Sequence, residues 1–525
     1  MLRVFADQPG VAHREWIEKY GNGVGAVRFR GVFGEDRVLI TDPAALTHIL
    51  VTNSYDYPKP LAVRGELSRI LGKGLVFVEG DDHRRQRKIM NPAFSPSALR
   101  DLTPLFFELS YKLRDHWLDL LSTDTVDESA FKSQAAVQAF KESRPDDSQI
   151  VVNVMRWMSR YTLDVIGKGG FGYTFDALDG KENVLREAFS NIFSSSVSLP
   201  TTKTLLIQNI MAKVAVYLPA IVIYAPSKRV KAFRKAFDTM NSEGRKIVQA
   251  RKSELEGSAT EDESGKDLLT LMLKANASGD VKMRMSDEEL QGQMTTFLLA
   301  GHETTASSLT WGLWQLAKNH AIQDKLRKEI RQARSKAKEE GRDELGSDEL
   351  NSLEYLDAVC REILRVECPV SATVRCSEKD DLIPLSAPIT GISGRKISYI
   401  PVKAGGLIIL SFNAANFNKS VFGEDAEDFR PERWIEGHVG EKQGGVGVYS
   451  QLLTFLAGPR ACIGYKFSLL EMKAALSVLV DTLEFDEREP GLAIRHQLAF
   501  VASPIVIGEE QELAYAMPLR VKLAK

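Results

Sequence analysis

The feature that most constrains this chain is a long helical pattern between Ser286 and Asn319. It opens with Ser286 and Glu289, which are spaced as a capping box. From Met294 to Leu316, apolar or small residues occupy nearly every face, and a helix that is apolar all round is a buried one. At about 1.5 Å per residue this helix would be roughly 50 Å long, so it could cross an entire large domain.

The length, composition, net charge and cysteine count exclude several classes of protein. The 525 residues suggest about three domains by length alone, and the 44% of hydrophobic residues is enough for a full core. The formal charge of −2 argues against nucleic acid as a partner, because neutralising phosphates needs a basic face. The four cysteines form no CxxC pair, which disfavours a zinc ribbon or a dithiol redox site, and they are too few for a disulfide-stapled secreted protein.

Most of the remaining chain has the pattern of helices, for example Ser352 to Pro369. Two polar stretches, Ser122 to Gln134 and Lys252 to Asp267, are expected to be surface loops that do not pack. Strand patterns are fewer, so the sequence predicts a mainly α fold with small sheets. These patterns lie at Arg37–Asp42, Arg395–Val402, Gly406–Phe412 and Arg520–Ala524.

One cysteine, Cys462, stands just before a helical pattern, in the stretch FLAGPRACIG from Phe455 to Gly464. A helix N-terminus favours a thiolate, because unpaired N–H groups and the positive end of the dipole gather there. Gly458 and Gly464 would let something flat approach the backbone, and Arg460 could meet a carboxylate on that ligand. Three interpretations stay open on these residues alone: a structural cysteine, a nucleophile with a distant histidine, and an axial ligand to haem iron.

The same stretch resembles the haem-binding signature of the cytochrome P-450 family, Phe-x-x-Gly-x-Arg-x-Cys-x-Gly. All five fixed positions agree, namely Phe455, Gly458, Arg460, Cys462 and Gly464. Other motifs resemble the family in the family's order, and the resemblance extends from about Trp16 to the C-terminus. The resemblance, to eukaryotic microsomal and fungal-like members, implies one P-450 domain over residues 1–525. The fold expected is mainly α, with a small β-rich part and a long central helix over the haem.

The central helix carries Ala300-Gly-His302-Glu303-Thr304-Thr, which resembles the oxygen-binding segment of the family. Two polar residues interrupt an apolar buried helix there, and buried polar groups need a reason. The ordinary alternative is a threonine hydroxyl that bonds back to its own turn. The resemblance implies that Thr304 holds dioxygen and that Glu303 relays protons to it. A lone histidine is more often packed or hydrogen-bonded, so His302 is not expected to bind iron.

Two further motifs resemble a structural charge network of the family. Glu362 and Arg365 are spaced i, i+3 on one helix face, a pair that in isolation is usually a surface ion pair. Arg433, in FRPERW, resembles the third partner. The resemblance implies that these three residues form a buried network that holds the loop before the cysteine.

A basic stretch from Gly80 to Lys88 resembles the family's helix beside the haem. His83 and Arg87 are spaced i, i+4 and are expected to face the haem propionates together, although the family often has tryptophan at the position of His83. Arg375 fits a further propionate contact, and Arg460 is assigned there too. Arg84, Arg85 and Lys88 are then expected to point outward, where they could attract an acidic electron donor.

The resemblance implies a haem-thiolate monooxygenase with haem b, in which Cys462 is the axial ligand. One oxygen atom of O2 would enter a hydrophobic organic substrate, with electrons from an NADPH–cytochrome P-450 reductase. Substrate contacts are expected from five places, most of them apolar. These are the loop before Gly80, Phe193 to Tyr224, the helix around Phe297 and Ala300, Val370 to Val374, and Leu498 to Phe500.

Localisation rests on weaker patterns. No uncharged apolar run reaches the ~20 residues of a membrane span, and the first residues do not read as a signal peptide. Val214 to Pro226 is short and broken by Pro219, and it is expected either to pack in the core or to touch a bilayer. The resemblance implies the cytosolic face of the endoplasmic reticulum membrane. If the N-terminus given is complete, without an anchor, a soluble cytoplasmic protein is expected.

Three other functions compete with a monooxygenase. A haem-thiolate isomerase or dehydratase needs no external electrons, and Glu303 and Thr304 argue against it. A non-catalytic haem-binding or sensor protein would show no substrate-dependent use of NADPH. A cysteine hydrolase is the most distant alternative.

Overall fold

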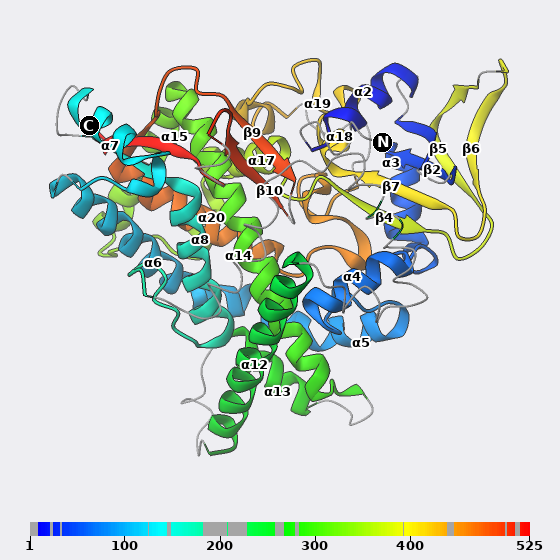
Figure 1. The fold of residues 1–525 in the computed structure, drawn as a ribbon, viewed down its shortest axis with the longest axis horizontal. Helices are drawn as coiled ribbons and strands as arrows, with labels where there is room; N and C mark the ends of the chain where they lie inside the picture. Colours follow the sequence, from blue (N-terminus) through cyan, green and yellow to red (C-terminus); the bar gives the residue numbers. More distant parts are fainter. Residues whose placement is uncertain are drawn as a thin grey trace.

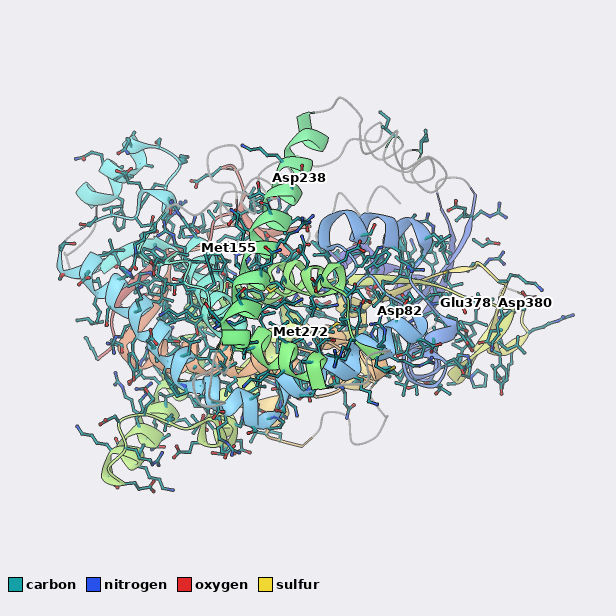
Figure 2. All side chains as sticks on the ribbon, turned by 90° about the horizontal axis from the view of Figure 1, so that it is seen from below. Asp82, Met155, Asp238, Met272, Glu378 and Asp380 are labelled. Atoms are coloured by element: carbon teal, nitrogen blue, oxygen red, sulfur yellow. The ribbon has the colours of Figure 1, made fainter. Side chains whose placement is uncertain are left out.

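The computed structural model describes residues 9–21, 25–31, 34–123, 125–143, 149–181, 207, 210, 228–257, 267–278, 283–391, 393–437, 446–498, 501–509 and 515–525. The helices and strands divide into a large helical part and a smaller part built on a sheet (Figure 1). In Figure 2, Glu378 and Asp380 mark the outer edge of the sheet part, and Met155 lies in the helical part. This mainly α architecture with small sheets confirms the predicted fold class.

The longer helices are α2 (Val11–Tyr20), α4 (Leu61–Leu71), α5 (Gly80–Met90), α6 (Pro96–Ser122), α7 (Gln134–Ser143), α8 (Val154–Val165), α12 (Lys228–Gly257), α13 (Leu268–Ser278), α14 (Asp287–Lys318), α15 (His320–Glu339), α17 (Glu354–Val366) and α20 (Tyr465–Thr482). The short ones are α3 (Pro43–Thr47), α16 (Ser347–Ser352), α18 (Phe412–Asn416) and α19 (Lys419–Phe422).

The largest sheet has four strands in the order β1 (Ala26–Arg30), β2 (Asp36–Ile40), β7 (Leu407–Ser411) and β4 (Ala372–Cys376). Its β2–β7 pair is parallel, with Val38 opposite Ile408, and its other pairs are antiparallel. A second sheet has the order β3 (Gln149–Asn153), β11 (Pro518–Leu523) and β8 (Leu483–Glu487). Two hairpins complete the strands, β5 (Asp381–Thr390) with β6 (Lys396–Val402) and β9 (Ile494–Leu498) with β10 (Ala502–Val506).

Helix α14 confirms the prediction of a long buried central helix. Its N-cap is Ser286, whose hydroxyl accepts from the Glu289 N–H, and the Glu289 carboxylate accepts from the Ser286 N–H in return. Leu309 and Leu313, in the C-terminal half of the helix, are completely buried. The helix passes through the middle of the molecule (Figure 1).

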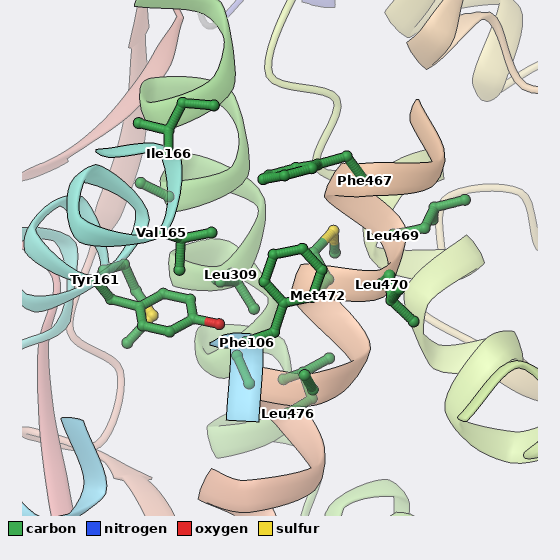
Figure 3. Close-up of a cluster of buried hydrophobic side chains, with 14 of the residues drawn as sticks. Phe106, Tyr161, Val165, Ile166, Leu309, Phe467, Leu469, Leu470, Met472 and Leu476 are labelled. Carbon is green, nitrogen blue, oxygen red and sulfur yellow. The ribbon is translucent and has the colours of Figure 1, made fainter. Parts of the chain in front are cut away.

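The main hydrophobic core joins α6, α8, α14 and α20. Figure 3 shows Phe106 of α6, Tyr161 of α8 and Leu309 of α14 facing Met472 and Leu476 of α20. All five side chains are buried, because the four helices pack against one another through apolar side chains. The packing fixes the position of α20, and thereby of the chain that enters it.

A second core cluster places the segment before α20 against the four-stranded sheet. Leu453 and Ala457 pack there with Leu50, Tyr57 and Ile408. The segment that carries the cysteine motif is therefore held by the helical core on one side and by the sheet cluster on the other.

The prediction that Ser122 to Gln134 does not pack was wrong. Val126 and Phe131 are buried. Asp127 fixes the turn that separates these two residues, because its carboxylate accepts from the N–H of Ser129 and from Nε1 of Trp157. The loop predicted from Lys252 was also wrong in its first part, since α12 continues to Gly257. Residues 258–266 and Val214 to Pro226 lie outside the described residues. Among the residues that are described, no helix is both long enough and apolar enough for a membrane crossing.

Candidate active site

Cys462 lies in the turn that leads into α20, two residues after the short helix η10 (Gly458–Arg460). Its N–H donates to the carbonyl of Phe455 at 2.9 Å, which closes the loop over the motif. Of the four cysteines, Cys462 is exposed, whereas Cys360 and Cys368 are buried and Cys376 is half-buried.

The expectation that the helix terminus favours a thiolate is only partly met. Protein atoms crowd around the exposed Cys462, and this desolvation raises the pKa of its thiol above the usual value. The N–H of Gly464 and the charge of Arg87 act in the opposite direction and lower this pKa. Burial and these two groups therefore act against each other at the sulfur.

The two motif glycines differ in their surroundings: the chain's own packing requires a glycine at Gly458, whereas the space beside Gly464 is open. Gly458 has a φ of 64°, and a Cβ there would lie 2.1 Å from the carbonyl oxygen of Leu50. A side chain at Gly458 would push the cysteine loop away from the π-turn η1 (His48–Thr52). Gly464 is the N-cap of α20, and a Cβ there would meet only Phe94 at 3.7 Å.

Three cationic side chains, Lys59, Arg375 and Arg460, gather around the carboxylate of Glu79, and a fourth, Arg87, lies close by. Arg460 donates to the carboxylate of Glu79, and Lys59 Nζ lies 2.6 Å from Glu79 Oε1. Burial lowers the pKa of Lys59 to about 8 and that of Arg375 to about 10, and the other cations nearby add to both shifts. Among the described residues no carboxylate pairs with Arg375 or Arg87; Arg375 donates to Thr373 Oγ1 at 2.9 Å and to the Val374 carbonyl at 3.0 Å.

Two side chains of helix α5, His83 and Arg87, also lie at the cluster around Glu79. Arg87 donates to the carbonyl of Ala461, directly before the cysteine. His83 is buried, and its Nδ1 lies 3.0 Å from the hydroxyl of Tyr55. Burial, with help from the nearby cations, lowers the pKa of His83 to about 4, so the imidazole is neutral at pH 7.

Arg84 and Lys88 of α5 are exposed, as expected, but the prediction for Arg85 was wrong. Arg85 is mostly buried and pairs with Glu289 at the start of α14. The reason is tertiary: α5 packs beside the N-terminal turn of α14, where the capping-box carboxylate attracts a cation.

The motif on α14 interrupts a buried helix. Ala300, Gly301 and Thr304 are partly exposed, although the preceding residues Gly292 to Leu299 are buried, and their i, i+1, i+4 spacing places them on one face. The Thr304 hydroxyl donates to the Ala300 carbonyl at 2.6 Å, which is the back-bond of the ordinary alternative. Glu303 is buried, and desolvation raises the pKa of its carboxyl to about 7.

A hydrogen bond joins the α14 motif to the cysteine helix. Thr305 Oγ1 and Ser468 Oγ, in the first turn of α20, are 3.0 Å apart. Phe94 adds a second link, because its ring pairs with Phe297 at 5.5 Å and lies against Gly464. These contacts bring the α14 motif with Thr304 close to the cysteine turn, although the two are some 160 residues apart in sequence.

Glu362, Arg365 and Arg433 form one buried cluster. Arg365 Nη2 lies 2.7 Å from Glu362 Oε1, and Arg433 Nε lies 2.9 Å from the same oxygen. The three side chains are at most 1% exposed. Trp434 Nε1 donates to the other oxygen of Glu362 at 2.9 Å, so the single carboxylate is fully satisfied.

Sequence reasoning missed Lys59 and Glu79. Neither belongs to a motif, and their partners are remote in sequence. Lys59 stands between Pro58 and Pro60, a rigid setting that could have drawn attention to it. Of the predicted substrate contacts, Phe297 is buried, and Val370 is partly buried. Most of Phe193 to Tyr224 lies outside the described residues, as do 499 and 500.

Comparison with known proteins agrees with this arrangement. The family model described as Cytochrome P-450 matches residues 5–506. The chain is 37% identical to cytochrome P-450 monooxygenase 205 of Postia placenta over 99% of this chain and 90% of the relative. It is 33% identical to cytochrome P-450 monooxygenase claQ of Ampulloclitocybe clavipes, over 98% of this chain and 89% of the relative. The chain belongs to the cytochrome P-450 family and is a P-450 monooxygenase.

Proposed function

We propose that this enzyme is a haem-thiolate monooxygenase in which Cys462 is the protein ligand of the haem iron. The family implies haem, dioxygen, a redox partner and an organic substrate. The observation that supports the role of Cys462 best is its place: the exposed cysteine lies directly beside a cluster in which buried cations outnumber carboxylates.

The residues of this cluster fit the acidic side of haem b. Lys59, Arg375 and Arg460 lie around one carboxylate, Glu79, and Arg87 lies beside His83 at the edge of the same cluster. A buried cation without a counter-ion is costly. Nε of Arg460 is buried and has no partner among the described residues. Two propionates would offset this excess of positive charge, so Arg375 and Arg87 would hold them with His83 as a neutral neighbour.

When bound, haem iron supplies activation of dioxygen, and a thiolate ligand favours cleavage of the O–O bond. The protein's own residues do the rest. Cys462 gives up its proton to become the ligand, with the Gly464 N–H and Arg87 stabilising the negative sulfur. Glu303 exchanges protons near neutral pH because its pKa is about 7. The Thr304 hydroxyl, on the open face of α14, holds the proton that is passed on.

The buried network of Glu362, Arg365 and Arg433 has a structural role in this proposal. Arg365 also donates to the carbonyls of Ala426 and Asp428, and Arg433 donates to the carbonyl of Phe422 at 2.8 Å. The network thus fixes the segment that leads toward the cysteine loop and keeps the ligand turn in register with α20.

The remaining parts of the proposal rest on the family. One oxygen atom is inserted into a hydrophobic substrate, and electrons come from an NADPH-dependent reductase. Residues 1–525 form one P-450 domain. The enzyme works at the cytosolic face of the endoplasmic reticulum membrane.

Oxygen-isotope labelling tests the reaction class. The purified enzyme, supplied with NADPH–cytochrome P-450 reductase, is screened against hydrophobic compounds under 18O2. A product that carries one 18O atom and appears only with NADPH is the expected result. A product that forms without NADPH and without the label would identify an isomerase or dehydratase instead.

Replacement of Thr304 by alanine is expected to uncouple the reaction. Alanine lacks the hydroxyl that Thr304 places on the open face of α14. Proton delivery to the reaction then fails, while NADPH is still consumed. The ratio of product to NADPH should fall about 10²-fold or more, the lower range for a positioned proton donor. Thr310→Ala is the control, because Thr310 also bonds back along α14, at 2.7 Å to the Ala306 carbonyl, but is completely buried. Unchanged coupling in Thr304→Ala would remove Thr304 from the mechanism.

A further inference from the structure

The carboxyl group of Glu303 is not in contact with Thr304 but with its other neighbour, His302. Nε2 of His302 lies 3.2 Å from Glu303 Oε1. The same nitrogen lies 2.9 Å from the hydroxyl of Ser159, which comes from α8. Thr304 is engaged elsewhere, since its hydroxyl donates to Ala300. The Glu303 carboxyl group thus contacts His302, and His302 in turn contacts Ser159 on α8.

We propose that His302 and Ser159 are positioning residues that hold the carboxyl group of Glu303 beside α8. The inference rests on the proposed function, in which Glu303 handles protons for the reaction. It adds two residues, His302 and Ser159, to which the sequence motif gave no such task.

His302 could serve either as a proton carrier or as a neutral group that positions Glu303, and its protonation decides between the two. A carrier would have to accept a proton and become an imidazolium ion. Complete burial lowers the pKa of His302 to about 3, so the charged form is very rare at neutral pH. His302 therefore works as a neutral hydrogen-bonding group that positions the acid rather than as a proton carrier.

Among the described residues, the ion-pair contact of Glu303 is the one with His302. Most of the charged groups on the neighbouring elements are held by partners of their own. On α8, Arg160 lies over the ring of Trp157, and Asp164 accepts from the N–H groups of Ala177 and Leu178. In η5 (Ile166–Gly170), Lys168 pairs with Glu108. On α20, both carboxyl oxygens of Glu471 are buried without a hydrogen-bond partner among the described residues, and Thr305 and Tyr161 lie nearby. Figure 3 shows Tyr161 and Val165 of α8 beside α14.

In this proposal the ring proton of His302 is on Nε2, which lies within reach of both Ser159 and Glu303. A single N–H cannot serve two acceptors fully, so Ser159 and Glu303 share it. Without the serine hydroxyl, the N–H would turn wholly to the Glu303 carboxylate and stabilise its ionised form. Without the imidazole, the carboxylate would lose its donor and the protonated form would be favoured. The two replacements are therefore expected to shift the titration of Glu303 in opposite directions, which a general loosening of the fold would not do.

Infrared spectroscopy of the purified holoenzyme tests this without a substrate or a reductase. The carbonyl band of a protonated carboxylic acid is followed from pH 5 to 9, and the spectrum of Glu303→Gln is subtracted to isolate Glu303. Ser159→Ala should lower the midpoint, and His302→Leu should raise it, each by about one pH unit. His302→Gln keeps an N–H donor and should restore a midpoint near that of the original protein.

Ser307→Ala is the matched control, because Ser307 lies on the same helix but donates to the carbonyl of Ala502 at 2.8 Å; it should leave the midpoint unchanged. Midpoints that stay fixed in Ser159→Ala, or that move the same way in both variants, would overturn the proposal, as would a carboxyl band that does not titrate. A failure of the monooxygenase proposal would show separately, in the 18O2 experiment, while these midpoints still moved.

Discussion

Replacement of Cys462 by alanine is expected to abolish thiolate-type haem binding and NADPH-dependent oxidation. Cys462 is the only exposed cysteine of the four, and no other sulfur stands at the start of α20. Losing an outer partner of a metal ligand costs about 10- to 100-fold, so losing the ligand itself should cost more than that. Haem content, the visible spectrum and the rate of product formation measure the effect.

Two matched variants make the result specific to Cys462. Cys376→Ala removes a half-buried thiol whose Sγ lies 3.6 Å from the Pro58 carbonyl, and it should retain the thiolate spectrum. Cys462→His supplies a nitrogen ligand, so any haem it binds should show a histidine-type spectrum. An unchanged spectrum in Cys462→Ala would contradict the assignment.

Replacement of Glu362 by glutamine is expected to have the largest effect on stability. The change leaves Arg365 and Arg433 buried with no full counter-charge, and breaking a buried ion pair costs about 3–5 kcal/mol. A whole fold is commonly stabilised by only about 5–15 kcal/mol. We therefore expect low yield, poor haem retention and a strongly lowered denaturation midpoint, measured by circular dichroism.

Asp36→Asn is the control for this prediction. Arg28 also makes two bonds to the Asp36 carboxylate, at 3.2 and 2.6 Å, but both side chains are exposed. Solvent screens such a pair, so its loss should change the midpoint far less. Equal effects of the two variants would show that burial of the Glu362 cluster is not what makes it important.

The parts of the fold that could be predicted from the sequence are those with strong local patterns. The capping box of Ser286 and Glu289 and the apolar faces of α14 predicted that helix to within a residue at its start. The strand patterns predicted β2, β6, β7 and β11. Seven strands were missed, and all but β5 have five residues: β1, β3, β4, β5, β8, β9 and β10. A five-residue strand is defined by its partner in the sheet more than by its own residues.

The residues of the site likewise divide into those that a local sequence motif predicts and those that come together only in the fold. The motif residues could be named in advance because each motif is compact in the sequence, whereas Glu79 and Lys59 meet Arg460 only after folding. The outward orientation predicted for Arg85 failed for the same reason, since Glu289 is 204 residues away along the chain. Sequence periodicity also gives no sign that burial raises the pKa of the Cys462 thiol more than the Gly464 N–H and the charge of Arg87 lower it.

The visible spectrum of the purified protein, reduced with dithionite and exposed to carbon monoxide, tests the central claim most directly. A thiolate ligand donates electron density to the iron, and this should give a strongly red-shifted Soret band that disappears in Cys462→Ala. A histidine-type band, or a protein that binds no haem, would contradict Cys462 as the iron ligand and with it the account of the site.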